Sequence, residues 1–246
     1  MKLIAPSFLS RISLLLLFAL AILHSPALLA DNSPRPTRIA CIGSSTTYGY
    51  GLKNRTYNSY PAWLGRWLGT NYDVRNFGVS GTTLLYKGNM PYVKQPAHAD
   101  ALAFKPDILI IFLGGNNSKH PGPGSLNTNN VVNNWQYKAD FVPNYESFIA
   151  DFRHANPAIR IYICYPTPAF PGRWGINDNT IHHEIIPRVH QVAADTGVKV
   201  IDLYDALAGR KDLFPDTVHP NELGARLVAA CVYTAVMGKA PPLGHE

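Results

Sequence analysis

The stretch "DILIIFLGGNNSK", residues 107–119, decides the fold of this chain. From Ile108 to Leu113 every residue is apolar, which is typical of a strand that is covered on both faces of a sheet. Strands of this kind belong to parallel sheets with helices on both sides. The polar, glycine-rich peptide at 114–119 marks the carboxyl end of this strand. The stretch therefore predicts a buried parallel sheet with a polar edge.

The remainder of the chain repeats the alternation of strand and helix. Four more runs have strand character, at 37–43, 72–79, 159–165 and 198–203. Segments with helical spacing lie between or after the strands, at 60–69, 95–104, 141–155, 181–197 and 221–237. This alternation predicts the α/β class, as a single three-layer α/β/α domain whose five-stranded parallel sheet has the flavodoxin-like order 2-1-3-4-5. No linker divides the chain, so we expect one domain over residues 36–240.

The first thirty residues have the layout of a secretory signal peptide. Lys2 and Arg11 precede the apolar run "SLLLLFALAIL", and the small residue Ala30 ends the segment. We expect residues 1–30 to be removed, which predicts an exported protein, periplasmic or secreted; an uncleaved N-terminal anchor is the alternative. No later segment is long and apolar enough to cross a bilayer, so we expect no stable membrane insertion after cleavage.

The charged residues give no indication of a nucleic-acid partner. The formal net charge of +6 falls to +4 when Lys2 and Arg11 leave with residues 1–30, which contain no Asp or Glu. The remaining Lys and Arg residues are scattered, with no basic run that would bind a phosphate backbone.

Three cysteines in an exported chain raise the question of a disulfide. Cys41 and Cys164 lie in strand-like runs, and Cys231 lies in the last helical segment. In the expected strand order, the strands of Cys41 and Cys164 flank the strand at 107–113 and stand roughly 9–10 Å apart. A disulfide needs Cα atoms within about 7 Å, so we expect these two thiols not to be bonded to each other.

The polar peptides of the chain gather at one edge of the expected sheet. In open α/β sheets, ligands bind beyond the carboxyl ends of the strands. Each predicted strand is followed by such a peptide or by a loop that carries one: "GSSTT" at 43–47, "SGTT" at 80–83, "GGNNSK" at 114–119, "PTPAF" at 166–170 and "FPDTVHP" at 214–220. A site is therefore expected at this edge.

These peptides supply each group that serine-dependent ester hydrolysis requires. Ser45 is the candidate nucleophile, His219 its general base, and Asp216 the group that orients the imidazole. The backbone N–H groups of Ser45 and Gly81 and the side-chain amide of Asn116 are candidates for the oxyanion hole. Taken alone, a Gly-Ser-Ser peptide can be a simple turn and Asp-x-x-His a loop hydrogen bond. The combination at successive strand ends favours catalysis.

Four blocks of this sequence resemble the SGNH hydrolases, also called GDSL esterases and lipases. The blocks are "IGSSTTYG", "NFGVSGTT", "LGGNNSK" and "FPDTVHPNELGA". The resemblance implies the SGNH-type fold, a Ser45–His219–Asp216 triad, an oxyanion hole at Ser45, Gly81 and Asn116, and neither a metal nor another cofactor.

Further stretches, such as "SYPAWLGRWLG" and "NWQYKADFVPNY", are similar to the carbohydrate O-acetylesterase branch, which includes sialate and xylan esterases. The resemblance covers nearly all of residues 36–237. It implies an acylated saccharide as substrate and hydrolysis of a short acyl ester, acetyl foremost. Trp135 and Trp174 lie in loops near the expected site and are candidate substrate contacts. The sequence does not indicate an oligomeric state.

Three features depart from the family pattern. Ser44 stands where the family usually has aspartate, and Asn117 replaces the aspartate that usually follows Asn116. Both changes remove a carboxylate near the site, so its local support is expected to differ. The stretch 120–133 is an apparent insertion rich in Pro, Gly and Asn, and we expect it to be a mobile lid or binding loop.

Other functions fit the residues less well. The nucleophile elbow of α/β-hydrolases is excluded because Thr47 occupies its second glycine position. "HHEIIPRVH" at 182–190 lacks the H-E-x-x-H spacing of a zinc site and contains Pro187, so we expect a solvated helix face. A lipase- or lysophospholipase-like esterase and an inactive carbohydrate-binding relative are the alternatives that stay open.

Overall fold

The computed structural model describes residues 35–121, 132–172 and 174–242 of the 246-residue chain. Residues Pro36–Glu246 form one compact unit, and the fold below is that of its described part. The expected signal peptide and most of the inserted stretch at 120–133 lie outside the described residues.

A five-stranded parallel sheet in the order β2-β1-β3-β4-β5 forms the centre of this unit. Its strands are β1 (Thr37–Gly43), β2 (Tyr72–Gly78), β3 (Ile108–Phe112), β4 (Arg160–Cys164) and β5 (Lys199–Ile201). All five residues of β3 are buried, as the apolar run predicts. The predicted strand order and the α/β/α class are both confirmed.

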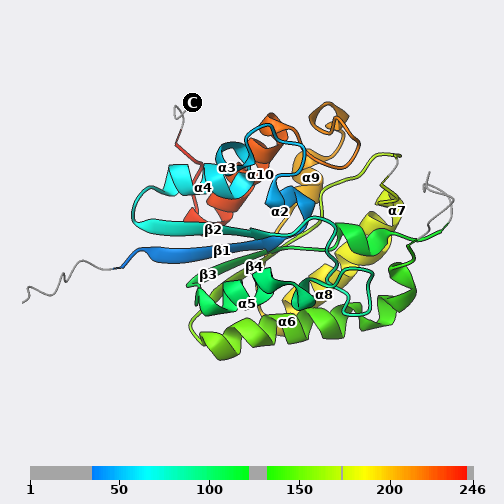
Figure 1. The fold of residues 1–246 in the computed structure, drawn as a ribbon, viewed down its shortest axis with the longest axis horizontal. Helices are drawn as coiled ribbons and strands as arrows, with labels where there is room; N and C mark the ends of the chain where they lie inside the picture. Colours follow the sequence, from blue (N-terminus) through cyan, green and yellow to red (C-terminus); the bar gives the residue numbers. More distant parts are fainter. Residues whose placement is uncertain (1–34, 122–131, 173, 243–246) are drawn as a thin grey trace, which may run out of the picture. The chain divides into compact units, whose positions relative to one another are not determined.

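Helices cover both faces of the sheet (Figure 1). One layer contains α3 (Arg55–Asn58), α4 (Tyr60–Leu68), α9 (Leu203–Leu207) and α10 (Glu222–Met237), and the opposite layer contains α5 (Pro96–Ala103), α6 (Phe141–Ala155) and α8 (Ile186–Thr196). Side chains alternate between the layers because successive strand residues point to opposite faces. Ile39 and Cys41 pack with α4 and α10, whereas Ala40 and Ile42 pack with α5 and α6.

Short elements fill the connections around the carboxyl edge of the sheet. They are α2 (Ser45–Tyr48), α7 (Asp178–Thr180), η1 (Tyr92–Lys94), η2 (Gly115–Ser118), η3 (Trp135–Asp140), η4 (Ile181–Ile185) and η5 (Lys211–Leu213). The sequence pattern indicates none of them as a separate element, because three to six residues are too few to show a helical period.

The segment predicted as one helix at 181–197 has two parts. Its first turn, η4, is a π-helix, and the α-helix α8 begins only at Ile186. Pro187 is the second residue of α8 and directly follows the π turn. His182, His183 and His190 are exposed, as predicted for a solvated face. Among the described residues, no group of three or more His, Cys, Asp or Glu side chains is arranged to hold a metal ion.

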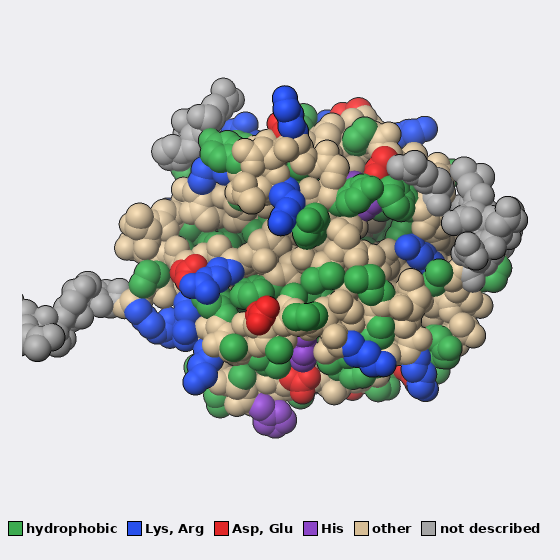
Figure 2. Space-filling view, viewed as in Figure 1, with side chains coloured by type: hydrophobic (Ala, Val, Ile, Leu, Met, Phe, Trp, Pro, Cys, Tyr) green, Lys and Arg blue, Asp and Glu red, His purple; other side chains and the backbone are tan. Residues whose placement is uncertain are grey.

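Cys41 on β1 and Cys164 on β4 are buried free thiols, and β3 lies between their strands. Burial raises the pKa of the Cys41 thiol to about 12. Figure 2 shows Lys and Arg side chains at several places on this face, some of them close together near its left edge, with Asp and Glu side chains among them. None of the helices in the described ranges has the length and apolar character needed to span a membrane.

Candidate active site

Ser45 lies in a sharp corner between β1 and α2. β1 ends at Gly43, and α2 begins at Ser45 itself. A Cβ atom at Gly43 would approach the carbonyl oxygen of Phe112 to 2.7 Å and would also collide with the Thr47 side chain. Glycine at this position therefore allows the chain to turn tightly enough to present the Ser45 side chain at the carboxyl edge of the sheet.

Asn76, near the end of β2, supports this corner. Its side-chain amide donates a 2.7 Å hydrogen bond to the carbonyl oxygen of Thr47, and its carbonyl accepts the Gly78 N–H at 2.9 Å. Asn76 thus holds α2 against β2. No role was predicted for Asn76 from the sequence, although its polar amide is part of the block "NFGVSGTT".

A chain of two hydrogen bonds joins Ser45, His219 and Asp216. The distance from Ser45 Oγ to His219 Nε2 is 2.8 Å, and the distance from His219 Nδ1 to Asp216 Oδ2 is 2.7 Å. Residues 174 positions apart are therefore in direct contact, in the geometry that activates a serine through a histidine. The three residues predicted for the triad are brought together.

The loop before α10 fixes Asp216. Its Oδ1 accepts the backbone N–H of His219 at 2.8 Å and that of Val218 at 3.2 Å. Burial alone would raise the pKa of Asp216, but the hydrogen bonds from His219 and from the loop backbone outweigh it and hold the pKa below its usual range. Asp216 is therefore ionised at neutral pH. Between Asp216 and Val218, Thr217 has a φ of 75°, a strained conformation for a β-branched residue.

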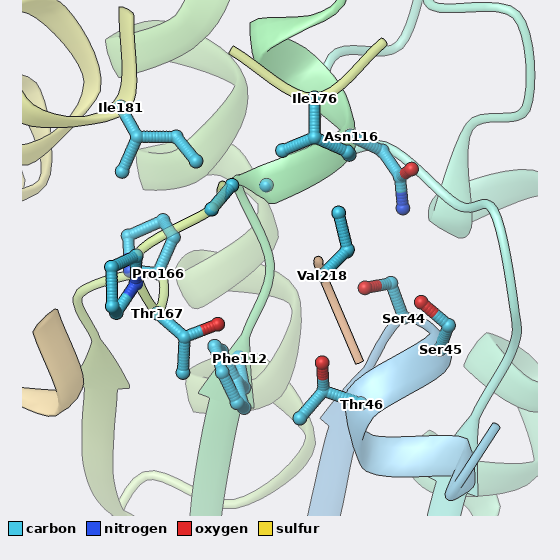
Figure 3. A pocket seen from close by; sticks show the side chains of 13 residues that line it. Ser44, Ser45, Thr46, Phe112, Asn116, Pro166, Thr167, Ile176, Ile181 and Val218 are labelled. Carbon is cyan, nitrogen blue, oxygen red and sulfur yellow. The ribbon is translucent and has the colours of Figure 1, made fainter. Parts of the chain in front are cut away.

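The candidate donors for an oxyanion, at Ser45, Gly81 and Asn116, line one cavity together with His219. Asn116 is buried in η2, and its amide donates one hydrogen to the carbonyl oxygen of Thr82 at 3.1 Å. A primary amide has two hydrogens, so one remains for a ligand. In Figure 3 the amide of Asn116 points toward Ser45. In the described part of the chain, the backbone N–H groups of Ser45 and Gly81 donate to no other residue. The three predicted donors are thus available.

Two cavities of different size meet at Ser45. The smaller has a volume of about 30 Å³ and is shown in Figure 3; Phe112, Pro166, Thr167 and Ile181 contribute to its wall. The larger has a volume of about 90 Å³. It is lined by Ser45, Tyr50, Ser80, Gly81, Asn116, Lys119, Trp174, Ile176, Val218 and His219.

Two aromatic rings flank His219 in the larger cavity. The Tyr50 ring lies 4.5 Å from the imidazole between centroids, and the Trp174 ring lies 5.2 Å away in an edge-on orientation. Trp174, predicted as a substrate contact, does line the cavity. Tyr50 was not predicted, although it follows the nucleophile block by only one residue.

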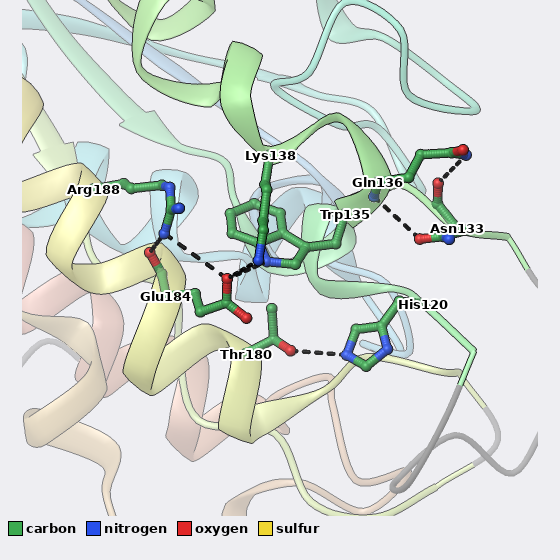
Figure 4. A network of polar contacts seen from close by, with 8 residues as sticks. All are labelled: His120, Asn133, Trp135, Gln136, Lys138, Thr180, Glu184 and Arg188. Carbon is green, nitrogen blue, oxygen red and sulfur yellow. Dashed lines mark hydrogen bonds and ion pairs between the residues drawn. The ribbon is translucent and has the colours of Figure 1, made fainter.

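The prediction of Trp135 as a substrate contact is wrong, because this side chain belongs to the core. It lines neither cavity beside Ser45 and is only 5% exposed. Its indole N–H donates a 2.9 Å hydrogen bond to Glu184, whose same oxygen accepts Lys138 Nζ at 2.9 Å (Figure 4). Trp135 therefore connects η3 with η4. Burial would raise the pKa of Glu184, but the bonds from Lys138 and Trp135 lower it overall.

The two departures from the family pattern take different positions. Ser44 lines the smaller cavity next to Ser45. Asn117 is fully buried, and its carbonyl accepts the Leu84 N–H at 3.1 Å. A carboxylate could accept the same bond, so Asn117 keeps the acceptor. Its amide nitrogen has no hydrogen-bond partner among the described residues, which is the cost of the replacement.

A serine, a histidine and a carboxylate joined by hydrogen bonds at the edge of an α/β sheet form the arrangement of serine hydrolases. The chain belongs to the GDSL-like lipase/acylhydrolase family, whose pattern matches residues 41–227. The resemblance stated from the sequence blocks is therefore confirmed.

A curated relative extends this comparison. The chain is 40% identical over 217 residues to an acetylxylan esterase of Xylanibacter ruminicola, in an alignment that covers 81% of this chain and 43% of that protein. The chain thus spans less than half the length of this relative.

Solved structures share the fold. A lipase/acylhydrolase from Enterococcus faecalis superposes with a TM-score of 0.63 at 24% identity, covering 86% of this chain and all of the other. An acetyl xylan esterase, AlAXEase, gives a TM-score of 0.61 at 21% identity, covering 81% of this chain and all of the other. At these identities the likeness establishes the fold alone.

Proposed function

We propose that this protein is a serine esterase that removes short acyl groups, acetyl foremost, from carbohydrate esters. The observation that carries the proposal is the hydrogen-bonded chain from Ser45 Oγ through His219 to Asp216, placed where a small and a larger cavity meet. Export to the periplasm or beyond, where acylated polysaccharides occur, is part of the same proposal and is supported by the signal-like sequence of residues 1–30.

In the first step, Ser45 Oγ attacks the carbonyl carbon of the ester and passes its proton to His219 Nε2. The ionised Asp216 holds the imidazole by its Nδ1–H and stabilises the positive charge that forms there. The negative charge on the former carbonyl oxygen is stabilised by the N–H groups of Ser45 and Gly81 and by the amide of Asn116.

In the second step, the bond to the sugar oxygen breaks, and His219 donates its proton to that oxygen. The acyl group stays on Ser45 as an ester. A water molecule then attacks the acyl carbon while His219 takes its proton, and the carboxylic acid leaves as Ser45 Oγ recovers a proton from His219.

The two cavities divide the substrate between them. His219 must protonate the leaving alcohol. Of the two cavities that contain Ser45, His219 lines the larger and not the smaller, so the saccharide is assigned to the larger. The acyl group then takes the smaller cavity. A volume of about 30 Å³ corresponds to roughly two water-sized groups. This size suits the methyl group of an acetyl ester.

The lining of the larger cavity supports a saccharide. Tyr50 and Trp174 supply ring faces and edges, and Ser80 and Asn116 supply polar groups. Sugars combine apolar ring faces with hydroxyl groups, so they suit a pocket of this composition. The relationship to a curated acetylxylan esterase supports the same substrate class.

A lipase- or lysophospholipase-like activity is the second candidate, but the small volume beside Ser45 favours a short acyl chain. An inactive relative is disfavoured by the complete Ser45–His219–Asp216 hydrogen-bond chain.

Acetate release from acetylated xylo-oligosaccharides, with p-nitrophenyl acetate as a second substrate, tests the proposal. Turnover of both substrates is expected, and Ser45→Ala serves as the control. Absence of turnover by the wild-type protein on both substrates, with the fold intact by circular dichroism, would contradict esterase activity. Preference for octanoate over acetate would favour the lipase-like candidate.

A further inference from the structure

Lys119 is a charged residue in the larger cavity to which the mechanism above assigns no role. It follows η2 directly and stands three residues after Asn116. Its side chain lines the cavity together with Ser45, Ser80 and His219. An ammonium group is therefore present in the space assigned to the saccharide.

The backbone of Lys119 is held firmly. Its carbonyl oxygen accepts the Asn134 N–H at 2.8 Å and the Trp135 N–H at 3.4 Å. The side chain of Asn134 in turn donates to the carbonyl oxygen of Asn116 at 2.8 Å. Asn134 thus forms hydrogen bonds to the backbone of both Lys119 and the oxyanion residue Asn116. These bonds fix the backbone of Lys119 relative to Asn116, which lies beside Ser45 in the cavity.

Lys119 has no acidic partner in the described part of the chain, in contrast to more exposed lysines. Lys87 pairs with Asp140 and Lys138 pairs with Glu184, each at 2.9 Å. Burial lowers the pKa of Lys119, and no neighbouring carboxylate opposes that shift. Residues 122–131 contain no Asp or Glu, so that segment cannot supply a carboxylate either.

A second polar group in the same cavity also lacks a partner. The hydroxyl oxygen of Ser80 is buried and makes no hydrogen bond within the described residues. Unpaired buried polar groups, charged ones above all, cost free energy unless a ligand pairs with them. No Asp or Glu side chain lines the larger cavity, and Asp216 lies behind His219. An anionic acceptor on a ligand would therefore suit both the Lys119 ammonium and the Ser80 hydroxyl.

We infer that Lys119, assisted by Ser80, binds a carboxylate carried by the saccharide part of the substrate, so that acetylated acidic saccharides are the preferred substrate class. A carboxylate can accept hydrogen bonds from an ammonium and a hydroxyl at once. The charge belongs to the saccharide and not to the acyl group, because Lys119 lines the cavity of His219 and not the smaller one. The inference rests on the proposed function.

The test compares two substrates that differ only in charge. They are an acetylated xylo-oligosaccharide that bears a uronic acid and the same compound with that carboxylate converted to a carboxamide. For the wild-type protein, kcat/KM should be about 10- to 100-fold higher on the acid, the range for a hydrogen bond to a charged group. The difference should lie mainly in KM and should shrink at high salt.

Lys119→Met should reduce this acid-to-amide ratio to about one, and Lys119→Arg should retain part of it. Lys87→Met, which removes an exposed lysine outside both cavities, is the matched control and should keep the wild-type ratio. An unchanged ratio in Lys119→Met would overturn the inference. So would an equal fall in kcat on both substrates, because Lys119 would then act on the oxyanion.

A binding measurement separates the inference from the proposed function. The deacetylated acid and its carboxamide are titrated calorimetrically into Ser45→Ala and into Ser45→Ala combined with Lys119→Met. The single variant should bind the acid about 10- to 100-fold more tightly, and the double variant should bind both equally. Equal binding by the single variant would overturn the inference even where hydrolysis is observed, and selective binding would uphold it even where hydrolysis is not.

Discussion

The two cavities that meet at Ser45 are built from different kinds of structure. The smaller is enclosed largely by residues at strand ends, such as Phe112 of β3 and Pro166 just after β4. The larger owes much of its lining to side chains that extend from loops, including Tyr50, Lys119 and Trp174. In our proposal the first holds the acyl group and the second holds the saccharide.

This difference indicates how the fold could change its substrate. The walls of the smaller cavity are part of the packed core around the sheet, so a larger acyl group would require the core to repack. The larger cavity can be altered by replacing loop side chains without disturbing the sheet. We therefore expect acyl length to be set by buried residues and saccharide preference by loop residues.

The largest effect on catalysis is expected from the nucleophile and its base, because both cavities serve the reaction at Ser45. Ser45→Ala and His219→Ala should each lower kcat on the order of a thousandfold or more, on acetylated oligosaccharides and on p-nitrophenyl acetate alike. The double variant should be little worse than either single one, because the two residues act as a unit. Steady-state kinetics, with circular dichroism to verify the fold, provide the measurement. Full activity in Ser45→Ala would contradict the role of Ser45 as the nucleophile.

The next effect concerns the oxyanion donor that lines both cavities. Asn116→Ala should lower kcat by about 100- to 1000-fold with little change in KM, because the lost hydrogen bond forms in the transition state. Asn117→Ala is the comparison variant, because the Asn117 side chain accepts a hydrogen bond from the Leu84 N–H and lines neither cavity. It should lower thermal stability more than kcat. A change confined to KM in Asn116→Ala would make this residue a substrate contact only.

The fold could be predicted well because it depends on patterns repeated along the chain. The continuous burial of residues 39–43 in β1 and of all five residues of β3 corresponds to the apolar and small residues of these runs. The predicted helix at 141–155 has the bounds of α6, and the predicted strand at 37–43 has those of β1. Two predicted segments depart in type. The first turn at Ile181–Ile185 is π-helical, which a single proline does not specify, and the predicted strand at 198–203 is a strand only at Lys199–Ile201, because α9 begins at Leu203.

The site residues also fall into two groups, those that follow strand ends and those in loops, and the first group is easier to predict from the sequence. Ser45, Gly81 and Asn116 follow strand ends, and their positions come from the sheet, so the sequence blocks predict them. The loop contacts are harder to predict, because an aromatic side chain near a site can turn inward or outward. Trp174 turns to the cavity, whereas Trp135 is held in the core by Glu184, a partner 49 residues away that no local pattern indicates.

Enlarging the smaller cavity tests whether it holds the acyl group. Ile181→Ala removes three carbons from its wall, so the ratio of kcat/KM on p-nitrophenyl butyrate to that on acetate should rise about tenfold, at ~0.8 kcal/mol per buried CH₂. Ile185→Ala is the matched control: it is equally buried in η4 but does not line the cavity. Both variants should lose stability, and only the first should change acyl preference. Identical ratios in the two variants would show that the smaller cavity does not hold the acyl chain.

The smallest effect on catalysis is expected from the two tryptophans, which separate a loop contact from a core residue. Trp174→Ala should raise KM for acetylated oligosaccharides about 2- to 10-fold, as for the loss of a ring contact worth ~0.5–1.5 kcal/mol, and Trp174→Phe should recover part of the loss. Trp135→Ala should instead lower the free energy of unfolding by about 3–5 kcal/mol, because it empties a buried site and leaves Glu184 without its indole donor. KM and urea unfolding, measured on both variants, give opposite patterns if this assignment is right. A raised KM with unchanged stability in Trp135→Ala would return Trp135 to the saccharide site and would mean that the segment around η3 moves when substrate binds.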